Sequence, residues 1–246
     1  MYTIRNINYE KDTLKIVELL RDEFGNRFSE SFFCWKHLQN PFGTSFGLVA
    51  VDENDKIIGV RLFMWWQFKI NNDIKFAIRP VDTTTDKRFR GMGIFKKLTL
   101  QGIDQLTGKY DFIFNTPNNN SLPGYLKMGW QKKLPNVDYY LNFVLPFSTK
   151  YDFINLDNVT RIPESGFNTN ETNKTLSFVN WRYQDGSYKK AWFTSAKQDC
   201  LIIYKVLEKK IAASSINMII VIDVIGDVAN LKKYLKSICK RENCIC

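Results

Sequence analysis

The residues best suited to chemistry form a short stretch that contains two glycines, Arg88-Phe89-Arg90-Gly91-Met92-Gly93. It follows a β-rich run, residues 75–85, and precedes a helical run, residues 94–106. Its glycines allow the backbone to approach a ligand closely. Amide groups and the helix dipole at such a helix start favour phosphate, and the two arginines add positive charge. The stretch therefore predicts a site for a cofactor that carries a pyrophosphate.

Three phosphate motifs compete for this stretch. A Walker loop requires Lys and Ser or Thr after its last glycine, but Ile94-Phe95 follows here. A dinucleotide fingerprint requires a third glycine where Lys96 stands, and a parallel βαβ unit at the start of the domain. The third motif, Arg/Gln-x-x-Gly-x-Gly/Ala after antiparallel strands, is matched by Arg88, Gly91 and Gly93.

A second motif follows the glycine stretch in the sequence: Asn118-x-x-Ser121-x-x-x-Tyr125-x-x-x-Gly129-Trp130. With both blocks, residues 1–145 resemble the GNAT superfamily of acyl-CoA-dependent N-acyltransferases, whose second block reads Asn-x-x-Ala-x-x-x-Tyr-x-x-x-Gly-Phe. The resemblance implies an α+β fold in which a central, mostly antiparallel, twisted sheet is flanked by helices. It also implies acyl-CoA as co-substrate and direct attack on the thioester by a primary amine.

The resemblance assigns a role to each matched residue. The amides of Phe89-Arg90-Gly91-Met92-Gly93-Ile94 would hold the CoA pyrophosphate, beside the Arg88 and Arg90 side chains. The strand end Thr83-Thr84-Thr85 would carry the pantetheine arm and direct an N–H at the thioester oxygen. Asn118, with Ser121 in the same block, would contact the pantetheine. Tyr125 would protonate the leaving thiolate as general acid, although packing against Trp130 is an alternative.

The general base has three candidates: His37, Asp82 and a chain of water molecules. His37 is the only histidine, and histidine titrates near neutral pH. The alternative for His37 is a histidine packed against Trp35 or partly exposed. Asp82 lies on the strand expected beside the thioester, and its alternative is an ion pair with Arg79 or Lys87.

The elements that must position these residues follow from periodicity and turn signals. Residues 10–24 and 30–39 predict helices, and residues 46–51, 57–70 and 74–85 predict strands. After the glycine stretch and its helix, residues 110–115 predict a short strand. Residues 121–128 predict a helix and residues 138–145 a further strand.

The second half, residues 146–246, contains an echo of the first. Ser177-Phe178-Val179-Asn180-Trp181-Arg182 resembles Ser31-Phe32-Phe33-Cys34-Trp35-Lys36, and each copy is followed by a polar turn and strands. Residues 157–174 predict a loop, residues 191–195 and 200–208 a strand pair, residues 216–224 a buried strand, and residues 229–240 a helix. We therefore expect a partial internal duplication. The second half would be a degenerate GNAT-like domain without the glycine loop.

Composition limits the partners. The 246 residues carry 35 Lys and Arg against 25 Asp and Glu, a formal charge of +10, which suits an anionic ligand. The basic residues are dispersed, so nucleic-acid binding is not expected. The apolar run at residues 216–225 is too short to span a bilayer, and the start of the sequence lacks the apolar core of a signal peptide. The five cysteines are an odd number without zinc spacing, so we expect a cytoplasmic protein without metal.

The acceptor is inferred by analogy. Trp35-Lys36-His37 with Asn40-Pro41-Phe42-Gly43, and the additional C-terminal half, resemble GNAT-type enzymes of surface-polysaccharide pathways. The expected acceptor is therefore a nucleotide-linked amino sugar, and the assembly considered is a homodimer. The alternative is a catalytically idle acyl-CoA-binding or regulatory module.

Overall fold

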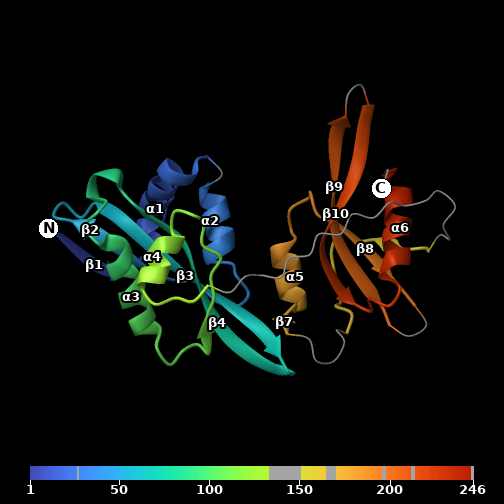
Figure 1. Ribbon diagram of the computed structural model, residues 1–246, viewed down its shortest axis with the longest axis horizontal. Coiled ribbons are helices and arrows are strands. Elements are labelled where there is room, and N and C mark those ends of the chain that lie inside the picture. Colours follow the sequence, from blue (N-terminus) through green and yellow to red (C-terminus); the bar gives the residue numbers. More distant parts are fainter. Residues whose placement is uncertain (27, 133–150, 165–169, 196–197, 212–213, 245–246) are drawn as a thin grey trace. The chain divides into compact units, whose positions relative to one another are not determined.

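The computed structural model describes residues 1–26, 28–132, 151–164, 170–195, 198–211 and 214–244. The chain divides into two compact units, residues 1–134 with 170–173, and residues 135–169 with 174–246 (Figure 1). The predicted strand at 138–145 and the predicted boundary at 145/146 lie outside the described residues.

The first unit is a helix-flanked sheet with strand order β1-β2-β3-β4-β5. All neighbours are antiparallel except β4 and β5, which run parallel, and a two-residue strand, β7, pairs with β3. This mixed α+β architecture agrees with the fold class expected from the sequence. The elements are β1 (Tyr2–Asn6), α1 (Tyr9–Phe24), α2 (Glu30–His37), β2 (Phe46–Asp52), β3 (Ile57–Ile70), β4 (Asp73–Thr85), the 3₁₀ helix η1 (Lys87–Phe89), α3 (Ile94–Leu106), β5 (Phe112–Ile113), α4 (Leu122–Lys127) and β7 (Glu171–Thr172).

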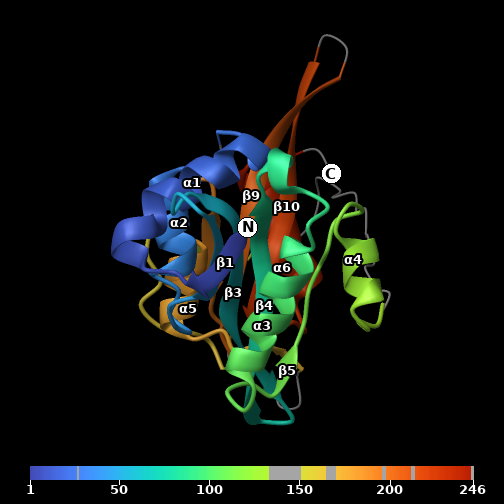
Figure 2. The ribbon, with the colours of Figure 1, turned by 90° about the vertical axis from the view of Figure 1, so that its left-hand side faces the viewer.

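Helices cover both faces of this sheet because its central strands are apolar on both sides. Val49 and Val51 of β2 pack with Ile16 and Leu20 of α1. The alternate residues of β2, Leu48 and Ala50, pack with Ile94 and Leu98 of α3. Successive side chains of a strand point to opposite faces, so α1 and α3 lie on opposite sides of the sheet (Figure 2).

The second unit has its own antiparallel sheet, with strand order β10-β9-β8-β6. Its core combines Phe193, Tyr204 and Tyr234, and the rings of Phe193 and Tyr234 stack with centroids 4.2 Å apart. The predicted buried strand at 216–224 is wrong in its burial, because Ile220 is 42% exposed and Ile222 is 38% exposed. The elements are β6 (Ile154–Asn155), α5 (Leu176–Arg182), β8 (Lys189–Phe193), β9 (Cys200–Ile211), β10 (Ser214–Gly226) and α6 (Leu231–Arg241).

Both units contain the order helix, three antiparallel strands, helix: α2-β2-β3-β4-α3 in the first and α5-β8-β9-β10-α6 in the second. The echoed residues lie on α2 and α5, which begin in the same way. The hydroxyl of Ser29 accepts from the amide of Phe32 at 3.1 Å, and that of Thr175 accepts from the amide of Phe178 at 3.2 Å. The sequence echo therefore coincides with matching local structure.

Candidate functional site

A cavity opens where β4 and β5 separate. The two strands pair only at Ala77–Phe112 and Ile78–Ile113. Beyond that point the residues of both segments line a cavity of about 660 Å³. The strand predicted for residues 110–115 is thus only two residues long, because its continuation forms the cavity wall. The lining residues are Glu23, Phe24, Lys36, Arg61, Arg79, Pro80, Val81, Asp82, Thr83, Thr84, Thr85, Arg90, Phe95, Asn115, Thr116, Pro117, Asn118, Asn120, Ser121, Gly124 and Tyr125.

The glycine stretch forms the turn between β4 and α3. Gly91 and Gly93 have φ of 84° and 74°, a left-handed conformation that favours glycine. A Cβ at either position would meet no protein atom within 4 Å, so the space beside this turn is open. Gly93 is the N-cap of α3 and supplies no side-chain cap. The first amides of α3 therefore have no side-chain partner at the cap, as an anion site requires.

The two arginines of the stretch lie at its rim in ion pairs. Arg88 pairs with Asp86 at 2.7 Å, and Arg90 pairs with Glu23 of α1 at 2.6 Å. Both arginines also line a second cavity, of about 370 Å³, together with Lys56 and Lys87. Asp22, Glu23 and Asp86 line it too, so the second cavity is lined by charges of both signs, with four cations against three carboxylates.

A bulge in β4 places the threonines and Asp82. Val60 faces Thr84 and Leu62 faces Val81, so Arg61 alone faces two residues, Asp82 and Thr83. Asp82 has φ of 42°, a left-handed conformation that is uncommon for residues other than glycine. The bulge interrupts the ladder and directs the Asp82 carboxylate toward the cavity wall.

Asp82 joins β4 to the end of α2. Its Oδ2 accepts from Lys36 Nζ at 2.7 Å and pairs with His37 Nε2 at 2.8 Å. Burial would raise the pKa of Asp82, but the hydrogen bond from His37 and the charge of Lys36 outweigh burial and hold the pKa at about 2. Asp82 is therefore an anion at neutral pH, and its Oδ1 has no hydrogen-bond partner among the described residues.

His37 lies behind this carboxylate. Its side chain is fully buried, and the cavity lining includes Lys36 and Asp82 but not His37. Both ring nitrogens are occupied, since Nδ1 bonds to the Ser45 hydroxyl at 2.9 Å. Burial lowers the pKa of His37 more than Asp82 raises it, so the ring is neutral at pH 7. Because a carboxylate only accepts, the proton lies on Nε2 and Nδ1 accepts from Ser45.

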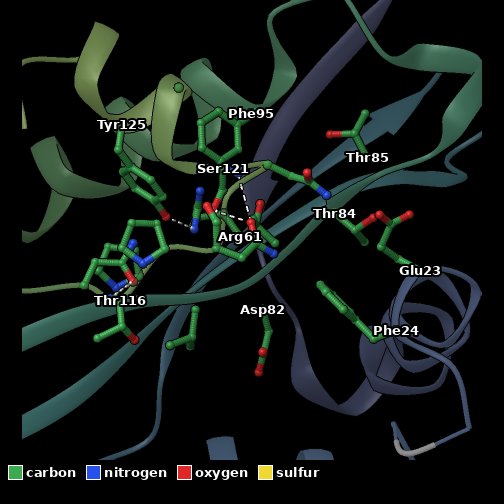
Figure 3. A pocket seen from close by; sticks show the side chains of 18 of the residues that line it. Glu23, Phe24, Arg61, Asp82, Thr84, Thr85, Phe95, Thr116, Ser121 and Tyr125 are labelled. Atoms are coloured by element: carbon green, nitrogen blue, oxygen red, sulfur yellow. Dashed lines mark hydrogen bonds between the residues drawn. The ribbon is translucent and has the colours of Figure 1, made fainter. Parts of the chain in front are cut away.

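Tyr125 of α4 lines the same cavity and contacts Arg61 of β3 (Figure 3). Its hydroxyl oxygen accepts from Arg61 Nη1 at 2.8 Å. Its ring packs edge-on against Phe95 and Trp130, with centroids 5.5 Å and 4.8 Å away. Tyr125 therefore packs against Trp130 and lines the cavity at the same time.

Asn118 and Ser121 form the turn that starts α4. Asn118 Oδ1 accepts from the amide and the hydroxyl of Ser121, both at 2.9 Å. Both residues line the cavity. The Asn118 oxygen is thus engaged within the turn.

Sequence reasoning assigned no site role to four charged residues of the cavity: Glu23, Lys36, Arg61 and Arg79. The sequence does indicate that Arg61 is unusual, because it is the only charged residue in the apolar run 57–64 of β3. A charge within such a run is rarely buried without a specific partner. Glu23 and Lys36 lie on helices whose approach to β4 depends on tertiary packing.

Among the described residues, no group of three or more His, Cys, Asp and Glu side chains is arranged to hold a metal ion. None of the described helices combines the length and apolar character needed to cross a bilayer.

No family model matches the sequence, and no curated protein matches it. Solved structures do match. A protein of unknown function from Enterococcus faecalis, described as a probable N-acyltransferase, has a TM-score of 0.69 at 10% identity; the match covers 98% of this chain and 63% of that one. A Trypanosoma brucei acetyltransferase has a TM-score of 0.46 at 18% identity; the match covers 57% of this chain and 100% of that one. An Arabidopsis thaliana glucosamine-6-phosphate N-acetyltransferase has a TM-score of 0.41 at 20% identity; the match covers 58% of this chain and 99% of that one.

The chain has the GNAT fold. Two observations support this statement: the match to the Enterococcus faecalis structure, which spans nearly the whole chain, and the strand order of the first sheet. The chain spans less than two thirds of that structure's length.

The contact between His37 of α2 and Asp82 at the bulge of β4 has a counterpart in the second unit. Tyr183 follows the echoed residues of α5 as His37 follows those of α2. Its hydroxyl donates to Asp223 Oδ2 at 2.8 Å, and Asp223 lies at a register shift in β10. Lys174 also pairs with Asp223 at 2.8 Å. The residues before α6 read Gly-Asp-Val-Ala-Asn, so the second unit has this contact without the glycine turn.

The low pKa of Asp82 makes a prediction about stability. A carboxyl group with a pKa of about 2 in the folded state and 3.8 in the unfolded state stabilises the fold above pH 3.8. That contribution is lost as pH falls through the folded value. Comparing wild type with Asp82→Asn by urea denaturation, we expect the advantage of wild type to shrink by about 2 kcal/mol between pH 5 and pH 2. An advantage that does not change with pH would contradict the buried ion cluster.

Proposed function

We propose that this protein is an acyl-CoA-dependent N-acyltransferase. The observation that carries the proposal is the cavity between β4 and β5, which is lined by Arg90 of the glycine turn and by Tyr125. A long ligand with a diphosphate at one end and a reactive thioester at the other fits such a site. CoA thioesters have this chemistry.

The glycine turn would bind the CoA diphosphate through the amides of residues 89–94. Arg88 and Arg90 would add charge, and Lys56 and Lys87 in the second cavity would contact the phosphorylated nucleoside end. The pantetheine arm would follow Thr83, Thr84 and Thr85 along β4, with Asn118 and Ser121 on the other side.

The reaction would be direct transfer. The amine nitrogen attacks the thioester carbonyl, the C–S bond breaks, and Tyr125 gives its proton to the sulfur. An amide of the interrupted β4 ladder would stabilise the developing oxyanion. Holding both substrates in one cavity supplies much of the rate.

Asp82 is proposed as the group that receives the amine. With a pKa of about 2 it is a permanent anion, so it attracts an ammonium ion more readily than it removes a proton. The proton would leave to water beside Oδ1. His37 would fix the carboxylate from behind rather than touch the acceptor, because its ring is buried and both nitrogens are bonded.

A nucleotide-linked amino sugar is the proposed acceptor. An anionic acceptor suits the net charge of +10 and a cavity wall that includes Lys36, Arg61, Arg79 and Arg90.

Thiol release from acetyl-CoA would be measured with nucleotide-linked amino sugars, aminoglycosides and polyamines. Turnover restricted to polyamines would contradict the proposed acceptor class.

Substituting the glycine turn tests the cofactor site. Gly91→Glu places a carboxylate against the diphosphate and should weaken CoA binding, measured by calorimetry, at least about tenfold. The matched control is Gly108→Glu, since Gly108 also has positive φ, of 80°, and open space around it. Equal affinities in the two variants would refute a diphosphate site at the turn.

Removing one hydroxyl tests the general acid. Tyr125→Phe should lower kcat about 100-fold or more, because the thiolate then leaves without a proton. The CoA affinity should stay within about twofold, since the ring is kept. Tyr110→Phe, outside the cavity lining, is the control. Unchanged turnover in Tyr125→Phe would assign the acid to another group, and CoA binding without any turnover in wild type would favour an idle binding module.

A further inference from the structure

Arg61 is a buried cation that packing alone does not explain. Its side chain is 0% exposed, and it is the largest of the fully buried side chains among the described residues. No carboxylate pairs with it in the part of the chain that the structure describes. Its Nε is buried without a hydrogen-bond partner. Burying a charge in this way is costly, and an apolar residue of similar volume is often as stable or more so.

The guanidinium is held in one orientation. Nη2 donates to Thr99 Oγ1 at 3.0 Å, and that hydroxyl donates to the carbonyl of Phe95 at 2.8 Å. The guanidinium carbon lies 4.9 Å from the centroid of the Phe95 ring. α3 thus fixes one arm and one face of the guanidinium, and the other arm, Nη1, donates to Tyr125 Oη.

This arrangement decides where the Tyr125 proton points. A tyrosine hydroxyl has one proton and lone pairs that accept, whereas arginine has donors only. Because the oxygen accepts from Nη1, its own proton cannot bond to Arg61 and is free to face the cavity that both residues line (Figure 3). Arginine stays charged even where burial lowers its pKa, as it does here.

We propose that Arg61 is a positioning residue that orients Tyr125 for proton donation and stabilises the phenolate left behind. The inference rests on the proposed acyl transfer. As the C–S bond breaks, the electron pair stays on sulfur and the Tyr125 proton moves to it, giving the free thiol. The negative charge then lies on Tyr125 Oη, 2.8 Å from Arg61 Nη1, until the phenolate takes a proton from solvent. A hydrogen bond to a charged group is stronger than one to a neutral group, so this contact strengthens during the step.

A double-mutant cycle tests the inference. Arg61→Met should lower kcat about 10- to 100-fold, with the KM for acetyl-CoA unchanged within about twofold. In the Tyr125→Phe background the same substitution should lower kcat by less than about twofold, because Arg61 acts through the missing hydroxyl. A residue that only maintains packing would lower kcat by the same factor in both backgrounds, and that outcome would overturn the inference.

Separate control experiments establish that each variant folds and that the wild type catalyses the reaction. Thermal melts and CoA affinity are measured for each variant. If Arg61→Met does not fold, the cycle is closed with Arg61→Lys, which keeps the charge but lacks the planar fork. The same non-additivity is expected there, and equal factors in both backgrounds would again overturn the inference. If wild type releases thiol and the Arg61 substitution lowers kcat by the same factor in both backgrounds, only the role of Arg61 is refuted. If wild type releases no thiol, the proposed function is refuted and this inference with it.

Discussion

The bulge at Asp82 interrupts the ladder between β3 and β4, and the rest of the site follows from that interruption. Two residues of β4 stand opposite Arg61, so Asp82 is turned into the left-handed region and its carboxylate meets Lys36 and His37 of α2. β4 has already separated from β5 after Ile78, so the bulge lies within the segment of β4 that lines the cavity. A left-handed residue other than glycine costs about 1 kcal/mol, and the ion cluster around Asp82 offsets that cost.

The second unit has the contact between helix and bulge without the Gly-x-Gly turn. Tyr183 and Asp223 meet at the same distance as His37 and Asp82, on a helix that begins with the same capping arrangement. Yet no glycine turn precedes α6. The contact is therefore a means of fixing the helix to the sheet, which the first unit combines with a cavity. This comparison favours a positional role for His37 over that of a free base.

Much of the first unit could be predicted from local sequence. The long strands, the glycine turn and the helix after it follow from periodicity, and positive φ at Gly91 and Gly93 follows from residue type. Local sequence could not predict that β5 is only two residues long, because its end depends on the separation from β4. It also missed Arg61, whose role appears only when α3, α4 and β3 meet. The exposure of Ile220 in β10 was missed because an apolar run does not reveal which neighbours cover it.

The central claim is that the opening between β4 and β5 holds an acyl-CoA with its sulfur at Tyr125. A crystal structure of the protein with a thioether analogue of acetyl-CoA tests it most directly. The account predicts the diphosphate on the amides of residues 89–94 and the sulfur within about 3.5 Å of Tyr125 Oη. An analogue bound in another cavity, or one in this cavity with its sulfur remote from Tyr125, would contradict it.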